Sequence, residues 1–341
     1  MTLAMQERIR HMKHFKALAL ASIIITSSCN KITTSELLNQ SSLAFDSGDY
    51  SNSVKLITRA LLDPTISTNT LADAYNQRGR AYLKLGDILK AENDFTRAIA
   101  NNKEPIYLIN MAVLLANTDR PNEALACLNI AMQAEDYDEL TPEAHSIACE
   151  YLGRCRFDLG DYTNALATLN STDNLSLDGL SLMARIYNIT GDNDKSVSIY
   201  SQILSVRPSS TKALTGIAEA YEDLGQYSNS LHFYQAGLDV DPTDIVAASG
   251  AARLLATTAD PNLNNPDEAI SIATKALLHA ADSSYLPWLH ESMASAYAAK
   301  GNFTQAIQHQ EYAIASSRYD SVRVKMNETL IRYKNDSSTT K

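Results

Sequence analysis

A short phrase recurs along this chain: a glycine, then a polar residue, with a small residue five positions after the glycine. It begins at Gly48, Gly86, Gly160, Gly191, Gly225 and Gly301. Successive glycines are 38, 74, 31, 34 and 76 residues apart, so each of the two wide gaps hides a degenerate copy. A period of about 34 residues is typical of stacked helix-turn-helix units. The sequence therefore predicts an all-α solenoid rather than one compact core.

Small and large side chains alternate at fixed places in each copy, as close packing of helices requires. Small residues on the expected first helices are Gly79, Ala112, Gly153, Ala184, Ala218 and Ala294. Small residues on the second helices are Ala91, Ala124, Ala165, Ser196, Ser230 and Ala306. Large residues between them are Tyr82, Phe95, Tyr187, Tyr200, Tyr221 and Tyr234. The turn glycines suit a left-handed backbone at a helix end, and Pro208 and Pro242 stop second helices.

These residues follow the pattern W-x2-L-G-x2-Y, A-x3-F, A, P, so residues 36–316 resemble the tetratricopeptide repeat (TPR) family. The resemblance implies a right-handed α-solenoid of about eight repeats. Four copies depart from the pattern, and the first of them, from Leu37 to Ala60, lacks the aromatic positions. Asp119 replaces a turn glycine, Arg156 stands at an aromatic position, and the seventh copy has a long turn at 260–266.

The long turn has two interpretations, a helix cap and a calcium loop. Asn265 can cap a helix that starts at Pro266, with Glu268 closing a capping box. A calcium loop of the EF-hand type needs glycine at 265 and glutamate at 271, but Asn265 and Ser271 stand there. The sequence favours the cap.

The end of the chain predicts a capping helix over 317–334. Val322, Met326, Leu330 and Tyr333 share one helical face, which would cover the open end of a solenoid. The polar residues 335–341 predict a disordered tail.

The first 28 residues have the organisation of a secretory signal. Basic residues from Arg8 to Lys16 precede a ten-residue apolar run, 17–26, which is too short to cross a bilayer. Small residues then lead to Cys29, and Met12 is a possible second start.

The segment before Cys29 resembles the bacterial lipobox, although Thr26 stands where leucine is usual. The resemblance implies that Cys29 carries fatty-acyl chains such as palmitate, which anchor the mature chain to a membrane. Residues 29–35 would be a tether. Asn30 rather than aspartate then implies the outer membrane of a Gram-negative cell, with the protein facing the periplasm. An ordinary cleaved signal and an uncleaved one stay open as alternatives.

The charge balance argues against nucleic acid as a partner. The chain has 29 basic and 39 acidic residues, and without residues 1–28 it keeps 25 basic and 38 acidic. A protein this acidic is repelled by phosphate backbones and anionic lipids.

No recognisable catalytic, cofactor or metal motif occurs in the sequence, which predicts a protein that is not an enzyme. His290 and His309 can approach within the last repeat, but no third ligand is evident. The cysteines at 127, 149 and 155 lack metal-ligand spacing and are expected to be buried small hydrophobes. A disulfide from Cys127 to Cys149 or Cys155 is the alternative.

Polar residues at matching positions of the first helices are candidates for a concave binding groove. Arginine forks suit carboxylates, and amides suit the backbone of an extended peptide. The candidate partner-binding residues are Asn76, Arg80, Asn110, Asn117, Arg154, Arg185 and Asn188. The alternative is that they only solubilise an unused face.

These features together predict a TPR scaffold that holds a protein or peptide partner at the cell envelope, without cofactors. The first alternative is an assembly factor for an outer-membrane secretion or pilus machine. The second is an envelope enzyme. The oligomeric state and the partner's identity do not follow from the sequence.

Overall fold

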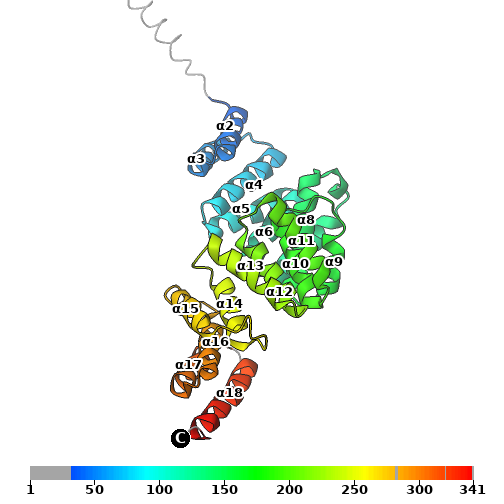
Figure 1. Cartoon of the computed structure of the whole chain (residues 1–341). Helices are drawn as coiled ribbons and strands as arrows, with labels where there is room; N and C mark the ends of the chain where they lie inside the picture. The colour runs from blue at the N-terminus through cyan, green and yellow to red at the C-terminus, as the bar shows by residue number, and fades with distance from the viewer. Residues whose placement is uncertain (1–31, 281–282, 319, 340–341) are drawn as a thin grey trace, which may run out of the picture. The chain divides into compact units, whose positions relative to one another are not determined.

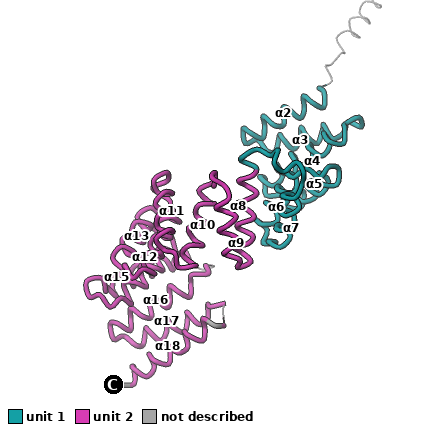
Figure 2. Tube along the Cα trace, turned by 90° about the vertical axis from the view of Figure 1, so that its right-hand side faces the viewer, with its two compact units in different colours: residues 1–144 teal, residues 145–341 magenta. Residues whose placement is uncertain are grey.

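The computed structural model describes residues 32–280, 283–318 and 320–339 (Figure 1). The predicted signal at 1–28, the lipidation site Cys29 and residues 340–341 of the predicted tail lie outside these ranges. The chain divides into two compact units at residue 145, and their described residues lie within 32–144 and 145–339 (Figure 2).

The described residues fold into 17 α-helices and one short 3-10 helix. Short turns join the α-helices into antiparallel pairs, in which we call the helices first and second. The pairs that precede residue 145 are α2 (Thr34–Asp46) with α3 (Tyr50–Ala60), α4 (Thr68–Lys84) with α5 (Ile88–Asn101), and α6 (Pro105–Asn117) with α7 (Pro121–Met132), after which η1 (Tyr137–Glu139) follows.

The remaining helices belong to unit 2, apart from the first residues of α8. They are α8 (Pro142–Asp158) with α9 (Tyr162–Leu169), α10 (Leu177–Thr190) with α11 (Asn193–Val206), α12 (Thr211–Asp223) with α13 (Tyr227–Val240), α14 (Ile245–Thr257) with α15 (Pro266–Leu277), α16 (Leu286–Ala299) with α17 (Phe303–Ser316), and α18 (Asp320–Thr339). Eight pairs and a final helix confirm the predicted all-α repeat fold.

The turn within most pairs has the left-handed backbone that the sequence predicts. All six turn glycines have φ between 72° and 83°. In the third pair Asp119 takes this place with φ 60°, an uncommon value for a residue with a Cβ atom. The third turn therefore keeps the geometry of the others although it lacks glycine.

The predicted small positions are where helices of a pair touch. All twelve small residues at these positions are buried. A Cβ atom added to Gly79 would lie 2.8 Å from the Phe95 ring, and one added to Gly153 would lie 2.8 Å from Leu169. The repeat pattern thus reflects steric contact between the two helices.

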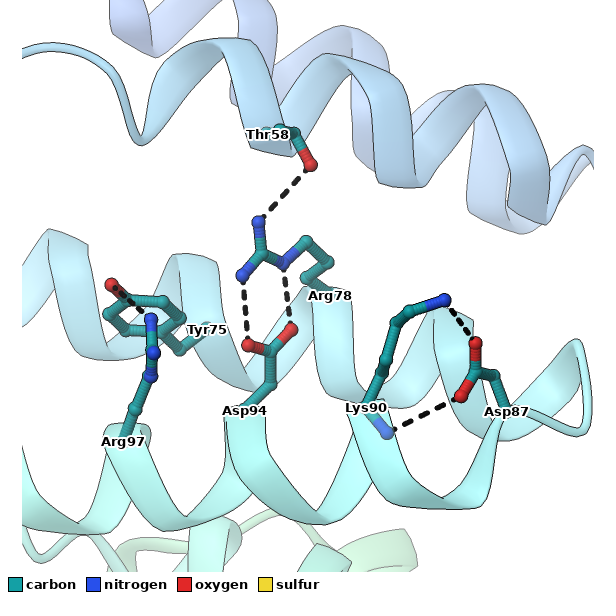
Figure 3. A network of polar contacts seen from close by, with 7 residues as sticks. All are labelled: Thr58, Tyr75, Arg78, Asp87, Lys90, Asp94 and Arg97. Carbon is teal, nitrogen blue, oxygen red and sulfur yellow. Dashed lines mark hydrogen bonds and ion pairs between the residues drawn. The ribbon is translucent and has the colours of Figure 1, made fainter.

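A buried ion pair joins the helices α4 and α5 in unit 1 (Figure 3). Arg78 donates from Nε and Nη2 to the two carboxylate oxygens of Asp94, at 2.7 and 2.9 Å. Its third nitrogen donates to Thr58 of α3 at 3.1 Å. The side chains of Arg78 and Asp94 are only 14% and 4% exposed. This fork is the most buried charged contact of the described ion pairs.

The chain begins its first described helix earlier than the tether predicted at 29–35 allows. Glu36 N donates to the Thr33 hydroxyl at 3.2 Å, and Thr33 N donates to the Glu36 carboxylate at 2.8 Å. This capping box starts α2 at Thr34, so residues 34 and 35 are helical rather than tether.

The long turn of the seventh pair ends in a helix cap, as predicted. Asn265 accepts a hydrogen bond from Glu268 N at 3.2 Å, and α15 starts at Pro266. The Glu268 carboxylate accepts from the side chain of Asn265 at 2.9 Å, instead of from the backbone amide expected of a capping box. That amide donates to Leu255 O at 2.9 Å, which ties the turn to α14.

The last helix is longer than the sequence predicted. Met326, Leu330 and Tyr333 are buried on its inner side, as the apolar stripe requires. However, α18 continues to Thr339, so residues 335–339 are helical and not a disordered tail. No glycine or proline follows Tyr333 to stop the helix, and polarity alone does not end one. Among the described residues, no helix has both the length and the apolarity to span a membrane.

Candidate functional site

A hollow of about 610 Å³ opens in unit 2 along three first helices, α8, α10 and α12. It is larger than the two other hollows described below. Its lining combines basic, acidic and apolar side chains: Glu150, Tyr151, Arg154, Phe157, Asp158, Ser176, Asp178, Gly179, Leu182, Arg185 and Lys212. Small-molecule sites are mostly apolar, so this charged and mixed lining suits a segment of polypeptide better than a small apolar ligand.

Three cations line this hollow, one from each helix. Arg154 is exposed on α8, Arg185 on α10 and Lys212 on α12. The Arg185 guanidinium carbon lies 4.8 Å from the centre of the Phe157 ring, a cation–π distance that orients the fork. Arg154 Nε lies 3.9 Å from Asp158, which is long for a charged hydrogen bond. Two candidates of the sequence analysis, Arg154 and Arg185, therefore share one hollow.

The wall between α8 and α10 is fixed by Glu150. Its carboxylate accepts from the Ser176 hydroxyl at 2.7 Å and also from the Ser176 backbone amide. Ser176 is the N-cap of α10, so this contact positions the start of that helix. A Cβ atom at Gly179 would lie 2.8 Å from the carboxyl carbon of Glu150, so a larger residue there would displace this carboxylate from Ser176.

A second hollow, of about 180 Å³, lies along the first helices α12, α14 and α16. Arg253 makes a two-bond contact with Glu222, in which Nη2 donates to Oε2 at 2.7 Å. Burial raises the pKa of the nearby Glu219, which also lines the hollow. Trp288, the one tryptophan of the chain, lines it too and is 37% exposed.

Unit 1 repeats the arginine–phenylalanine contact on a smaller scale. The guanidinium carbon of Arg80 on α4 lies 4.8 Å from the Phe45 ring centre on α2. Both residues line a hollow of only about 30 Å³. The buried Gln77 Oε1 in this lining has no hydrogen-bond partner within the described chain. Arg80 thus occupies the position of Arg185 in its repeat, but beside much less open space.

Three of the candidate asparagines link neighbouring first helices. Asn110 donates to Asn76 at 2.9 Å, and Asn76 is only 7% exposed. Asn188 donates to the Gly216 carbonyl at 3.0 Å. These side-chain amides form hydrogen bonds between neighbouring helices. Fewer of their donor and acceptor atoms are therefore left to bind a partner. Asn117 is exposed near the end of α6.

Sequence reasoning missed Lys212, Arg253 and Trp288 as lining residues. Lys212 lies six positions before the small residue Ala218, so extending the comparison of first helices by one turn would have found it. Arg253 lies one position after the small residue Ala252, the same offset as Arg185 from Ala184. Trp288 offers no such signal, because only one copy has tryptophan there.

The three described cysteines are free thiols. Cys149 and Cys155 are buried, as expected for small hydrophobes, and Cys127 is partly exposed. Burial raises the pKa of Cys155 to about 11, which disfavours the reactive thiolate. No group of three or more potential metal ligands occurs among the described residues.

Comparison with protein-family models gives two matches. Both are to the tetratricopeptide repeat, at residues 72–105 and 211–244. The first covers most of α4 and all of α5, and the second covers α12 and α13. The chain carries tetratricopeptide repeats. TPR proteins generally mediate protein–protein interactions, and TPR repeats are typically non-catalytic.

Among curated proteins, BBSome complex member BBS4 of Bos taurus is 28% identical over 114 residues, or 33% of this chain. The match spans only 22% of that relative's length. Among solved structures, YrrB, described as a TPR protein with an unusual peptide-binding site, is 14% identical. That match covers 56% of this chain and 95% of YrrB, with a TM-score of 0.45. Yeast Tom70 is 16% identical, with 85% of this chain and 59% of Tom70 covered and a TM-score of 0.49.

Proposed function

We propose that this chain is a non-catalytic TPR scaffold that binds a protein partner along the first helices of unit 2. The observation that carries the proposal is the hollow of about 610 Å³ lined by Arg154, Arg185 and Lys212. The lining also holds the carboxylates Glu150, Asp158 and Asp178, of which Glu150 is already bonded to Ser176, so basic and acidic groups alternate on this surface of a chain with a formal net charge of −10.

The partner segment is proposed to be extended, with acidic side chains next to apolar ones. Guanidinium forks bind carboxylates through two parallel hydrogen bonds, and Lys212 adds a third positive charge. Tyr151, Phe157 and Leu182 offer apolar surface in the same lining. Arginine and aromatic residues that meet in this way are typical of interface hot spots.

Replacing both arginines of the hollow (Arg154→Ala with Arg185→Ala) should lower partner capture at least tenfold. Hot-spot truncations cost about 2 kcal/mol or more, which is a factor of about 30 in affinity. The measurement is crosslinking in cells followed by quantitative mass spectrometry of the captured envelope proteins. The change removes two exposed side chains, so unit 2 should stay folded.

Arg207→Ala is the matched control, because Arg207 is exposed in unit 2 but does not line the hollow. It should retain full capture. Arg80→Ala tests whether the corresponding surface of unit 1 contributes. If the double variant captures the same partner as the unchanged protein, the hollow is not the binding surface. The alternative role in assembling an envelope machine would then gain.

We also propose that the scaffold is a lipoprotein of the outer membrane, facing the periplasm and anchored through Cys29. The support is the lipobox-like sequence before Cys29. In a Gram-negative host fed an alkyne analogue of palmitate, the chain should incorporate label at Cys29, and Cys29→Ser should abolish it. Membrane fractionation should place the labelled chain in the outer membrane.

Cys127→Ser is the control and should keep the label. The processed chain should begin at Cys29 whether translation starts at Met1 or at Met12. An unlabelled chain cut elsewhere would indicate an ordinary secretory signal. An unlabelled chain of full length would indicate an uncleaved one.

A further inference from the structure

Two histidines meet in the last helix pair of unit 2. His290 lies on α16 and His309 on α17. Their Nδ1 atoms are 3.1 Å apart, and the ring centres are 5.3 Å apart. In the unliganded pair one Nδ1–H donates to the other Nδ1. Neither residue belongs to the hollows described above.

Two tyrosines hold the rings in place. Tyr297 stacks on His309, with ring centres 5.4 Å apart and planes 13° from parallel. The ring centre of Tyr312 lies 5.4 Å from that of His290. Both imidazoles are half-buried, and Tyr312 is 51% exposed. The pair is therefore fixed on two packed helices yet reachable from solvent.

Both rings are held in the neutral form. Burial, helped by the neighbouring His309, lowers the pKa of His290 to about 4, and burial lowers the pKa of His309 as well. Neutral imidazole is the form that binds metal ions.

The distance between the two nitrogens matches the separation of two nitrogen ligands on one metal ion. Metal–nitrogen bonds of about 2.0–2.1 Å at angles of about 90–109° place two ligand nitrogens roughly 2.8–3.4 Å apart. The Nδ1 atoms lie within this range, at 3.1 Å. We propose that His290 and His309 form a two-ligand site for a divalent first-row transition-metal ion.

The protein supplies only two ligands, because no third histidine, cysteine or carboxylate joins the pair among the described residues. Water is expected to complete the coordination at the solvent side. Binding moves the proton from the donating Nδ1 to Nε2 of the same ring through solvent, so each imidazole stays neutral and both Nδ1 lone pairs face the ion. Imidazole ligands favour Cu²⁺, with Zn²⁺ and Ni²⁺ weaker, whereas Mg²⁺ and Ca²⁺ prefer oxygen.

The test is calorimetric titration of the untagged full chain with CuCl₂, ZnCl₂ and NiCl₂, with MgCl₂ and CaCl₂ as controls. We expect one strong site for Cu²⁺ and a weaker one for Zn²⁺, and no strong site for Mg²⁺ or Ca²⁺. Electron paramagnetic resonance of the Cu²⁺ complex at one equivalent should show two nitrogen ligands.

His290→Phe and His309→Phe keep an aromatic ring in place, and each should weaken Cu²⁺ binding at least tenfold. The double variant should bind Cu²⁺ only slightly more weakly than either single variant does. A single variant keeps one imidazole, which binds the ion as an ordinary monodentate ligand. His279→Phe is the matched control, because His279 is an exposed histidine of the same unit. The His279→Phe variant should bind Cu²⁺ with the same affinity as the unchanged chain. Circular dichroism checks that each variant is folded.

Unchanged Cu²⁺ affinity after loss of both rings would overturn the proposal. A one-nitrogen or three-nitrogen spectrum of the unchanged chain would also overturn it, and this result needs no variant to fold. Neither outcome bears on the partner surface, which lies on other helices.

Discussion

Gly250→Ala should destabilise unit 2 by about 1–3 kcal/mol, the usual range for overpacking a close contact. A Cβ atom at this position of α14 would lie 2.2 Å from Cζ and 2.4 Å from Cε1 of Tyr234. The Tyr234 ring is only 2% exposed, and its hydroxyl lies 3.4 Å from Glu222, so it has little room to move. Urea unfolding followed by Trp288 fluorescence measures the change, because this tryptophan lies in unit 2.

Gly237→Ala is the matched control in the neighbouring helix α13. There an added Cβ atom would meet nothing closer than Ala247 at 3.4 Å, which is ordinary contact. Alanine favours a helix over glycine by about 1 kcal/mol, so this variant should be as stable as the unchanged protein or more stable. Equal effects of the two substitutions would mean that the Gly250 contact is not a steric limit.

Asp94→Ala should destabilise unit 1 by about 3–5 kcal/mol, as expected when one partner of a buried ion pair is removed. The substitution leaves the Arg78 guanidinium, 14% exposed, without the carboxylate that accepts two of its hydrogen bonds (Figure 3). Hydrogen–deuterium exchange of α4 and α5 peptides measures the opening free energy of this region, which the single tryptophan in unit 2 does not report.

Glu123→Ala provides the contrast in the same unit. Its pair with Arg120 is exposed, and an exposed pair is worth about 0–1 kcal/mol. Joint replacement by apolar residues (Arg78→Met with Asp94→Leu) should recover much of the loss from Asp94→Ala, because no buried charge then stays unpaired. A loss from Asp94→Ala no larger than that from Glu123→Ala would show that the Arg78 pair behaves as a surface contact.

The candidate site was only partly predictable from residue types. The first helices carry asparagine and arginine at repeated positions, and the sequence treats both as groove residues. In the structure Arg154 and Arg185 line the open hollow, while Asn76, Asn110 and Asn188 bond to neighbouring helices. An amide both donates and accepts, so it can satisfy a neighbouring backbone or amide group. A guanidinium only donates, and here it faces outward.

The sequence by itself determined the repeat period, the positions of the turns and the small residues at helix contacts. These features follow from local backbone geometry and from steric limits between helices. The same constraints recur in every copy, and the sequence pattern therefore recurs with them. The tertiary structure decided which side chains meet across neighbouring helices. The fork between Arg78 and Asp94 and the pairing of His290 with His309 are such contacts within the described chain. Such contacts depend on ångström-scale distances between helices that no periodic pattern encodes.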